Sequence, residues 1–280
     1  MAEHRHPAAW LRTACLQAAG TPGEVETNLA ELNDAAARAA AAGANVLVTP
    51  EMFLTGYALS PAELDRLTDQ PLFEEVCTTA RRHSLSIVAG LPRRREDGAV
   101  TNCATLIDDN GEIRANHAKA HLYGDLDRNL FHPGDTTATL TTLHGIRVAL
   151  LVCYDVEFPE ATRLAALAGA QVALVPTALM HPYSFVATTL LPARAWENQI
   201  YVAYANRIGT EIGTEGELTF VGHSAIYAPD GTALASADAT PDLLIADMDT
   251  TVVERARAKN PYLRDRREEL YGGLSRAGET

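Results

Sequence analysis

Residues 148–160 read VALLVCYDVEFPE and mark a change from one kind of secondary structure to another. Their first part is apolar and rich in β-branched side chains, which predicts a buried strand that ends at Cys153. Pro159 and Glu160 then suit the first turn of a helix. A thiol at this corner would lie beside backbone N–H groups and a helix start, both of which favour negative charge. Cys153 is therefore a candidate nucleophile, although many unreactive cysteines are also buried.

The rest of the chain alternates in the same way between apolar strands and helices. The turn DDNG at 108–111 indicates a hairpin, which adds antiparallel strands to the sheet. The predicted strands are 11–17, 45–49, 85–91, 101–107, 113–119, 140–143, 148–152, 171–175, 200–205, 224–227, 234–236 and 243–248. The predicted helices are 23–43, 72–83, 160–168 and 185–199, and one more follows residue 248. This order predicts an α/β protein of mixed sheets with outer helices.

No linker, repeat or change of composition divides the 280 residues, so we expect a single domain over 1–280. Within it, residues 1–9 would be a flexible N-terminus and residues 261–280 an Arg-rich C-terminal arm. Residues 120–134 form a polar connection that is long enough to be a functional loop.

The composition excludes several classes of function. A net charge of -13 argues against nucleic acid and anionic membranes as partners. We find no apolar run of the roughly 20 residues that a transmembrane helix needs, and no signal-peptide core, so we expect a cytoplasmic protein. Four scattered cysteines without metal-finger spacing predict reduced thiols and no metal site; they are Cys15, Cys77, Cys103 and Cys153.

Three reactive side chains come at or just past the ends of predicted strands: Glu51, Lys119 and Cys153. Lys119 is one of only two lysines among 23 basic residues, the other being Lys259. In α/β folds, side chains at strand ends converge on a ligand. A carboxylate could take the thiol proton, and an ammonium could stabilise an oxyanion. Separately, Glu51 could be a helix-start acid and Lys119 a surface charge, but the coincidence of all three favours a site.

The motifs that contain these residues resemble the nitrilase superfamily of carbon–nitrogen hydrolases. The resemblance rests on PEMF at 50–53 with TGY at 55–57, KAHL at 119–122 leading to FHPG at 131–134, CYDVEFPE at 153–160, VPTA at 175–178 and APDG at 228–231. It implies an α/β (α+β) fold, a four-layer αββα sandwich with two mixed β-sheets, in a homodimer or higher homo-oligomer. It also implies Glu51 as general base, Lys119 as oxyanion stabiliser and Cys153 as nucleophile, with no cofactor and no metal.

One residue departs from the family pattern. Many members carry a second glutamate in the loop after the lysine, and this chain has Asp127 at that place. An aspartate is one methylene shorter, yet it could still orient the lysine or the substrate. Asp125 is the other candidate, and by default either would be a solvated loop acid. We expect Asp127 to be the fourth catalytic residue.

The segment CYDVEFPE, together with YGDLDR at 123–128 and PTALMHP at 176–182, looks most like the aliphatic amidase branch. Family members that act on N-carbamoyl amino acids often carry an arginine shortly after the nucleophile, to pair with the substrate carboxylate. This chain has Glu157 there, which would repel an acidic substrate. Glu157 could instead be structural, paired with Arg194 or capping the helix. The residues that we expect to contact the substrate are Tyr57, Tyr154, Glu157, Ala178 and His181.

The predicted activity is hydrolysis of small aliphatic carboxamides to acid and ammonia through a thioester on Cys153. Three alternatives stay open. An N-carbamoyl amine hydrolase would use the same residues and would also release carbon dioxide. An acyltransferase would pass the acyl group to an added acceptor, and a non-catalytic binding protein would keep the fold alone. Nitriles are the substrates that we expect least.

Overall fold

The computed structural model describes residues 9–213 and 216–271 and contains two six-stranded mixed sheets. In the first sheet the adjacent strands β1, β2 and β3 are parallel, and the remaining pairings are antiparallel. Across this sheet the order is β14 (Asp242–Asp249), β1 (Trp10–Gln17), β2 (Val46–Val48), β3 (Ser86–Arg94), β4 (Val100–Ile107) and β5 (Ile113–Ala118).

The second sheet repeats this plan, with parallel strands β7, β8 and β9 flanked by antiparallel ones. Its order is β13 (Ala233–Ser236), β12 (Ala225–Tyr227), β9 (Tyr201–Ala205), β8 (Val172–Pro176), β7 (Ile146–Leu150) and β6 (Thr139–Leu143).

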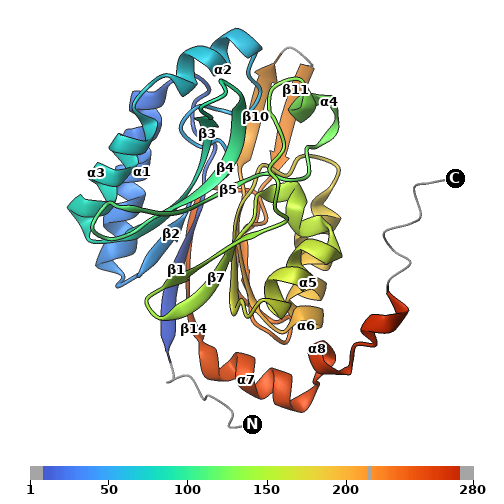
Figure 1. Cartoon of the computed structure of the whole chain (residues 1–280). Helices are drawn as coiled ribbons and strands as arrows, with labels where there is room; N and C mark the ends of the chain where they lie inside the picture. Colours follow the sequence, from blue (N-terminus) through green and yellow to red (C-terminus); the bar gives the residue numbers. More distant parts are fainter. Residues whose placement is uncertain (1–8, 214–215, 272–280) are drawn as a thin grey trace, which may run out of the picture.

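The two sheets lie face to face, and helices cover their outer sides (Figure 1). Helices α1 (Val25–Ala41) and α3 (Leu72–His83) cover the first sheet, while α5 (Pro159–Leu167) and α6 (Leu191–Asn198) cover the second. This arrangement is the four-layer αββα sandwich, and it confirms the predicted fold class. The first sheet also carries α2 (Pro61–Thr68) beside its loops.

Strand β2 shows why the inner strands read as continuous apolar runs. Val46 and Val48 pack in the core between the two sheets, whereas Leu47 points to the helices. Strand β7 does the same, since Val148 faces the other sheet and Ala149 faces the outer helices. Side chains alternate across a strand, so a strand covered on both faces is apolar at nearly every buried position.

Several elements differ from the sequence-based expectation. The hairpin of β10 (Ile208–Gly213) and β11 (Gly216–Val221) was not predicted, because its partly exposed, polar strands lack a clear apolar run. The predicted helix 185–199 is split into a π-helical turn, η2 (Val186–Leu190), and α6. The short α2 was also missed, although Ser60 and Glu63 form a capping box at its start.

The two predicted ends of the chain lie only partly within the described residues. Residues 1–8 and 272–280 fall outside them. The Ala9 N–H donates to Thr250 Oγ1, and the Thr250 N–H donates to the Ala9 carbonyl. The C-terminal segment continues from α7 (Thr250–Lys259) to the short α8 (Tyr262–Asp265) and a 3-10 turn, η3 (Glu268–Leu270). Among the described helices, none is long and apolar enough to cross a membrane.

Candidate active site

The three strand ends that carry Glu51, Lys119 and Cys153 meet between the two sheets. Glu51 follows β2, Lys119 follows β5, and Cys153 follows β7. The Glu51 backbone N–H donates to the carbonyl of Thr177, directly after β8 in the other sheet, at 3.1 Å. The two sheets are therefore tied together at this position.

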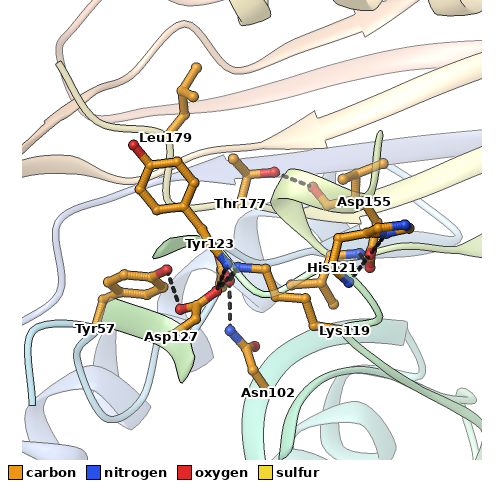
Figure 2. Close-up of polar contacts among 12 residues, drawn as sticks. Tyr57, Asn102, Lys119, His121, Tyr123, Asp127, Asp155, Thr177 and Leu179 are labelled. Atoms are coloured by element: carbon orange, nitrogen blue, oxygen red, sulfur yellow. Dashed lines mark hydrogen bonds and ion pairs between the residues drawn. The ribbon is translucent and has the colours of Figure 1, made fainter. Parts of the chain in front are cut away.

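Lys119 is fully buried between two carboxylates. Its Nζ lies 2.8 Å from Glu51 Oε1 and 2.7 Å from Asp127 Oδ2. Figure 2 shows the lysine reaching towards Asp127, with Tyr57 beyond that carboxylate. Burial disfavours the ammonium, but Asp127 and Glu51 outweigh it and raise the pKa of Lys119 well above its usual value. Lys119 therefore acts as a fixed positive charge.

Glu51 uses only one of its two oxygens within the described residues. Oε1 accepts hydrogen bonds from Lys119 and from Asn102 Nδ2, the latter at 2.6 Å. Oε2 is buried and has no partner there. Burial raises the pKa of Glu51, while Lys119 opposes this shift. An unpartnered buried oxygen is costly in a purely structural residue, so Oε2 is available to receive a proton.

Cys153 stands in a strained backbone conformation at the start of a 3-10 helix, η1 (Cys153–Glu157). Its φ of 44° lies in the left-handed region, which residues with a side chain seldom adopt. Burial raises the pKa of the thiol well above its usual value, Glu51 adds to the rise, and Lys119 opposes it. The group therefore rests as a thiol and needs a base before it can attack. The predicted strand-to-helix corner is present, because α5 follows η1.

Asp127 is buried and Asp125 is exposed, which separates the two candidates from the loop. Asp127 Oδ1 accepts a hydrogen bond from the Tyr57 hydroxyl at 2.7 Å, and Oδ2 accepts one from the Tyr123 backbone N–H at 2.9 Å. Asp125 lies 3.6 Å from Arg128 at the surface. Asp127 is thus the acid of this loop that contacts Lys119, despite being shorter than a glutamate.

Asp155 connects the loop that follows Lys119 with the loop that holds Cys153. Its Oδ1 lies 2.7 Å from His121 Nδ1 and accepts the His121 backbone N–H at 2.9 Å. Its Oδ2 accepts the backbone N–H of Val152 at 3.2 Å. Figure 2 shows Asp155 and His121 side by side, away from Asp127. Asp155 belongs to the CYDVEFPE motif, but no sequence pattern assigned it a role.

His117 completes the surroundings of this carboxylate, with Nε2 at 3.0 Å from Asp155 Oδ2. Burial favours the neutral acid, but the hydrogen bonds from His117 and His121 outweigh it and lower the pKa of Asp155. Asp155 is therefore an ionised, fully buried connector between the two loops.

The FHPG segment supports the backbone of Lys119. Gly134 N–H donates to the Lys119 carbonyl at 2.8 Å, and His132 N–H donates to the Val100 carbonyl at 2.8 Å. A Cβ on Gly134 would stand 2.2 Å from the Ala118 carbonyl oxygen. Only glycine allows the segment to approach so closely, which explains this part of the motif.

Arg207, just before the unpredicted hairpin, and Glu211, within its strand β10, hold the loop that carries Glu51. The buried Arg207 guanidinium donates to the carbonyls of Glu51 and Met52, at 3.2 and 3.1 Å, and also pairs with Glu211. Glu211 in turn accepts the backbone N–H of Tyr57 at 2.8 Å. Nothing in the local sequence pattern pointed to this pair, because its partners lie about 150 residues away in the chain.

A cavity of about 200 Å³ opens onto Cys153. This volume is below the roughly 300–1,000 Å³ of pockets that hold drug-sized ligands. Four of the five expected contact residues line it, namely Tyr57, Tyr154, Glu157 and Ala178. Tyr123, Leu179, Met180 and Tyr183 complete the wall. His181 is not part of it: the residue is exposed, and its backbone N–H bonds to the Thr219 carbonyl.

Neither structural role considered for Glu157 is present in the described residues. Arg194 donates to the main-chain carbonyls of Val156 and Glu157, at 3.0 and 2.6 Å, and not to the Glu157 carboxylate. Phe158 is the N-cap residue of α5, and no side chain forms a capping hydrogen bond there, so Glu157 does not cap that helix. Glu157 instead lines the cavity next to Cys153.

Residues 12–258 match the family described as carbon–nitrogen hydrolase, and the chain belongs to that family. It is a hydrolase of the nitrilase superfamily that acts on carbon–nitrogen bonds, as the motifs predicted. It is 42% identical over 269 residues to "Hydrolase in pqqF 5'region" of Pseudomonas protegens, covering 95% of this chain and 92% of the relative. It is 33% identical to an (R)-stereoselective amidase of a Pseudomonas species, covering 94% and 93%.

Among solved structures, the amidase of a Nesterenkonia species is similar, with a TM-score of 0.84 and 37% identity, covering 94% of this chain and 96% of that one. One mutant of that amidase was solved in complex with butyramide. Another carries acrylamide joined to the active-site cysteine by Michael addition.

Proposed function

We propose that the protein is an amidase that hydrolyses small aliphatic carboxamides to a carboxylic acid and ammonia. The observation that carries the proposal is the state of Glu51, whose Oε1 is held by Lys119 while its buried Oε2 has no partner among the described residues. Both charges shift the pKa of the Cys153 thiol, which Glu51 raises and Lys119 lowers. A base, a fixed cation and a nucleophile are the parts that amide hydrolysis through a thioester requires.

In the first half of the reaction, Glu51 takes the proton of Cys153 as the sulfur attacks the amide carbonyl. The negative charge that develops on the carbonyl oxygen is stabilised by the Lys119 ammonium and by the backbone N–H of Tyr154. That N–H lies in the first turn of η1, where such groups have no partner within the helix. Glu51 then gives the proton to the amine, which leaves as ammonia.

In the second half, water attacks the Cys153 thioester, and Glu51 accepts a proton from it. The acid leaves and the thiol is restored. In this proposal Asp127 is a positioning residue, because it holds the Lys119 ammonium in place. The Tyr57 hydroxyl in turn donates a hydrogen bond to Asp127. No cofactor takes part in this proposal, since each step uses only groups of this chain and a water molecule.

We expect ammonia and the matching acid to form from short amides such as propionamide and butyramide, because the cavity is small. The measurement is a coupled ammonia assay with chromatography of the acid, over a panel of amides, ureas and nitriles. Release of carbon dioxide with the ammonia would indicate the carbamoyl alternative. Product formation only with an added amine would indicate acyl transfer. No turnover of any amide would contradict the proposal.

We also propose a homodimer or higher homo-oligomer, as the family resemblance implies. Apolar side chains are exposed on the outer side of the second sheet, where α5, η2 and α6 lie: Leu164 at 52%, Phe185 at 63% and Trp196 at 42%. Such a patch favours burial against a second copy. Light scattering after gel filtration should give twice the mass of one chain, and the mass of a single chain would contradict this proposal.

Finally, we propose that residues 1–280 act as one domain in the cytoplasm. The shared core between the two sheets supports a single domain. The four free cysteines are consistent with a reducing compartment.

A further inference from the structure

The wall of the cavity combines aromatic rings with one carboxylate. Tyr123 lies edge to face against Tyr154, with ring centroids 5.3 Å apart, and against Tyr183 at 6.3 Å. Tyr57 adds a fourth tyrosine ring, and Glu157 is the only acidic residue of this wall among the residues that the structure describes. Tyrosine faces and a carboxylate are the groups that bind an organic cation.

No basic side chain among the described residues forms an ion pair with the Glu157 carboxylate. Arg194 is committed to main-chain carbonyls and to Glu197 Oε1, at 2.9 Å. Lys119 is held by Glu51 and Asp127. A half-buried carboxylate without a partner is costly, and a ligand could supply the missing positive charge.

The charges around Glu157 agree with this reading. Burial raises its pKa to about 7, and Lys119 and Arg194 only partly oppose the rise. Three other groups near Glu157 have raised pKa values: Tyr123, Tyr204 and Cys153. Burial is the main cause in each case, and the charge of Glu157 adds to the rise. They are therefore uncharged at neutral pH and do not compete for a cation.

We propose that the substrates of this site are amides whose acyl group carries a positive charge, and that Glu157 binds the ammonium. The inference rests on the proposed amidase function and names its substrate class. Glu157 would then attract a cationic substrate as well as repel an acidic one. The ammonium would lie against the tyrosine rings, while the amide carbonyl faces Cys153.

The test uses two amides of nearly the same shape, 3-aminopropanamide and butyramide. The first has an ammonium where the second has a methyl group, and an alkyl amine of this kind stays largely protonated well above neutral pH. The quantity measured is the ratio of kcat/KM for the charged amide to that for the neutral one. Any titration that affects both substrates equally cancels in this ratio.

In Glu157→Gln we expect this ratio to fall by about tenfold or more, as for loss of a charge-assisted hydrogen bond. The matched control is Glu160→Gln, which removes the same charge from an exposed position of α5 and should leave the ratio unchanged. An equal ratio in Glu157→Gln and in the parent would overturn the inference. That result would also arise if Glu157 bound the amide nitrogen common to both substrates.

The pH dependence gives a second readout. Because the pKa of Glu157 is raised to about 7, its carboxyl group is largely neutral below that pH and charged above it. In the parent, the ratio should therefore rise from about pH 6 to about pH 8 and then level off. In Glu157→Gln the rise should disappear. A ratio that stays flat in the parent would count against the proposal.

Binding to Cys153→Ala separates this inference from the proposed function. Calorimetry with the two amides needs no turnover, and we expect tighter binding of 3-aminopropanamide, again lost on adding Glu157→Gln. If the charged amide binds more tightly but neither amide is hydrolysed by the parent, the function is wrong and the cation site stands. If butyramide is hydrolysed and the charged amide binds no better, the cation site is wrong and the function stands.

Discussion

The Cys153→Ala variant should release ammonia from small amides at least about ten-thousandfold more slowly than the parent, as when a catalytic nucleophile is removed from a hydrolase. The sulfur forms the covalent bond to the acyl group, and in the described part of the chain no other thiol lines the cavity. The measurement is steady-state ammonia release together with mass spectrometry for an acyl adduct. We expect the adduct in the parent alone.

The control for this variant is Cys77→Ala, which removes a free, half-buried thiol of α3 and should retain full turnover. Circular dichroism should show that Cys153→Ala keeps its fold, because the change removes a single sulfur atom and therefore little packing. Turnover of Cys153→Ala near the parent rate would rule out the thioester mechanism.

The Lys119→Met variant should lose both activity and stability. Lys119 pairs with two buried carboxylates, and removal of one partner from a buried ion pair costs about 3–5 kcal/mol. Without the ammonium, the pKa of Glu51 would rise further above its value in the unfolded chain, since Lys119 now holds it down. A carboxyl group with a raised folded-state pKa destabilises the fold when the pH is high enough to ionise it. The loss of stability should therefore be larger at about pH 8 than at about pH 5.

Denaturant unfolding at these two pH values measures the effect. A second change, Asp127→Asn, removes one of the two carboxylates left without a cation, so it should restore part of the stability of Lys119→Met. It should not restore ammonia release. Recovery of both together would mean that Lys119 has only a structural role, and a pH-independent loss of stability would contradict the electrostatic explanation.

Much of the fold could be predicted from the sequence because the inner strands are covered on both faces. Such strands contain nearly continuous apolar runs, as from Val148 to Leu150 in β7, and these runs stand out from their surroundings. The hairpin β10–β11 has no such signal. Its strands are partly exposed, and what fixes it is the buried pair Arg207 and Glu211, whose partners are remote in the chain.

The candidate site was predictable where residues follow strand ends, as Glu51, Lys119 and Cys153 do. Their catalytic roles stay predictions. Asn102 was missed because it lies inside a strand, where one polar residue carries no distinctive pattern. The role of Glu157 could not be decided either, since only the structure shows that Arg194 binds its main chain instead of its carboxylate.

The connection made by Asp155 has a consequence for folding and for ligand binding. The lysine loop belongs to the first sheet and the cysteine loop to the second, so the reactive groups come together only when the two sheets associate. Binding in the cavity and association of the sheets are then thermodynamically linked. A bound amide should slow hydrogen exchange in β5 and in β7 together, and a fragment ending between them should form no site.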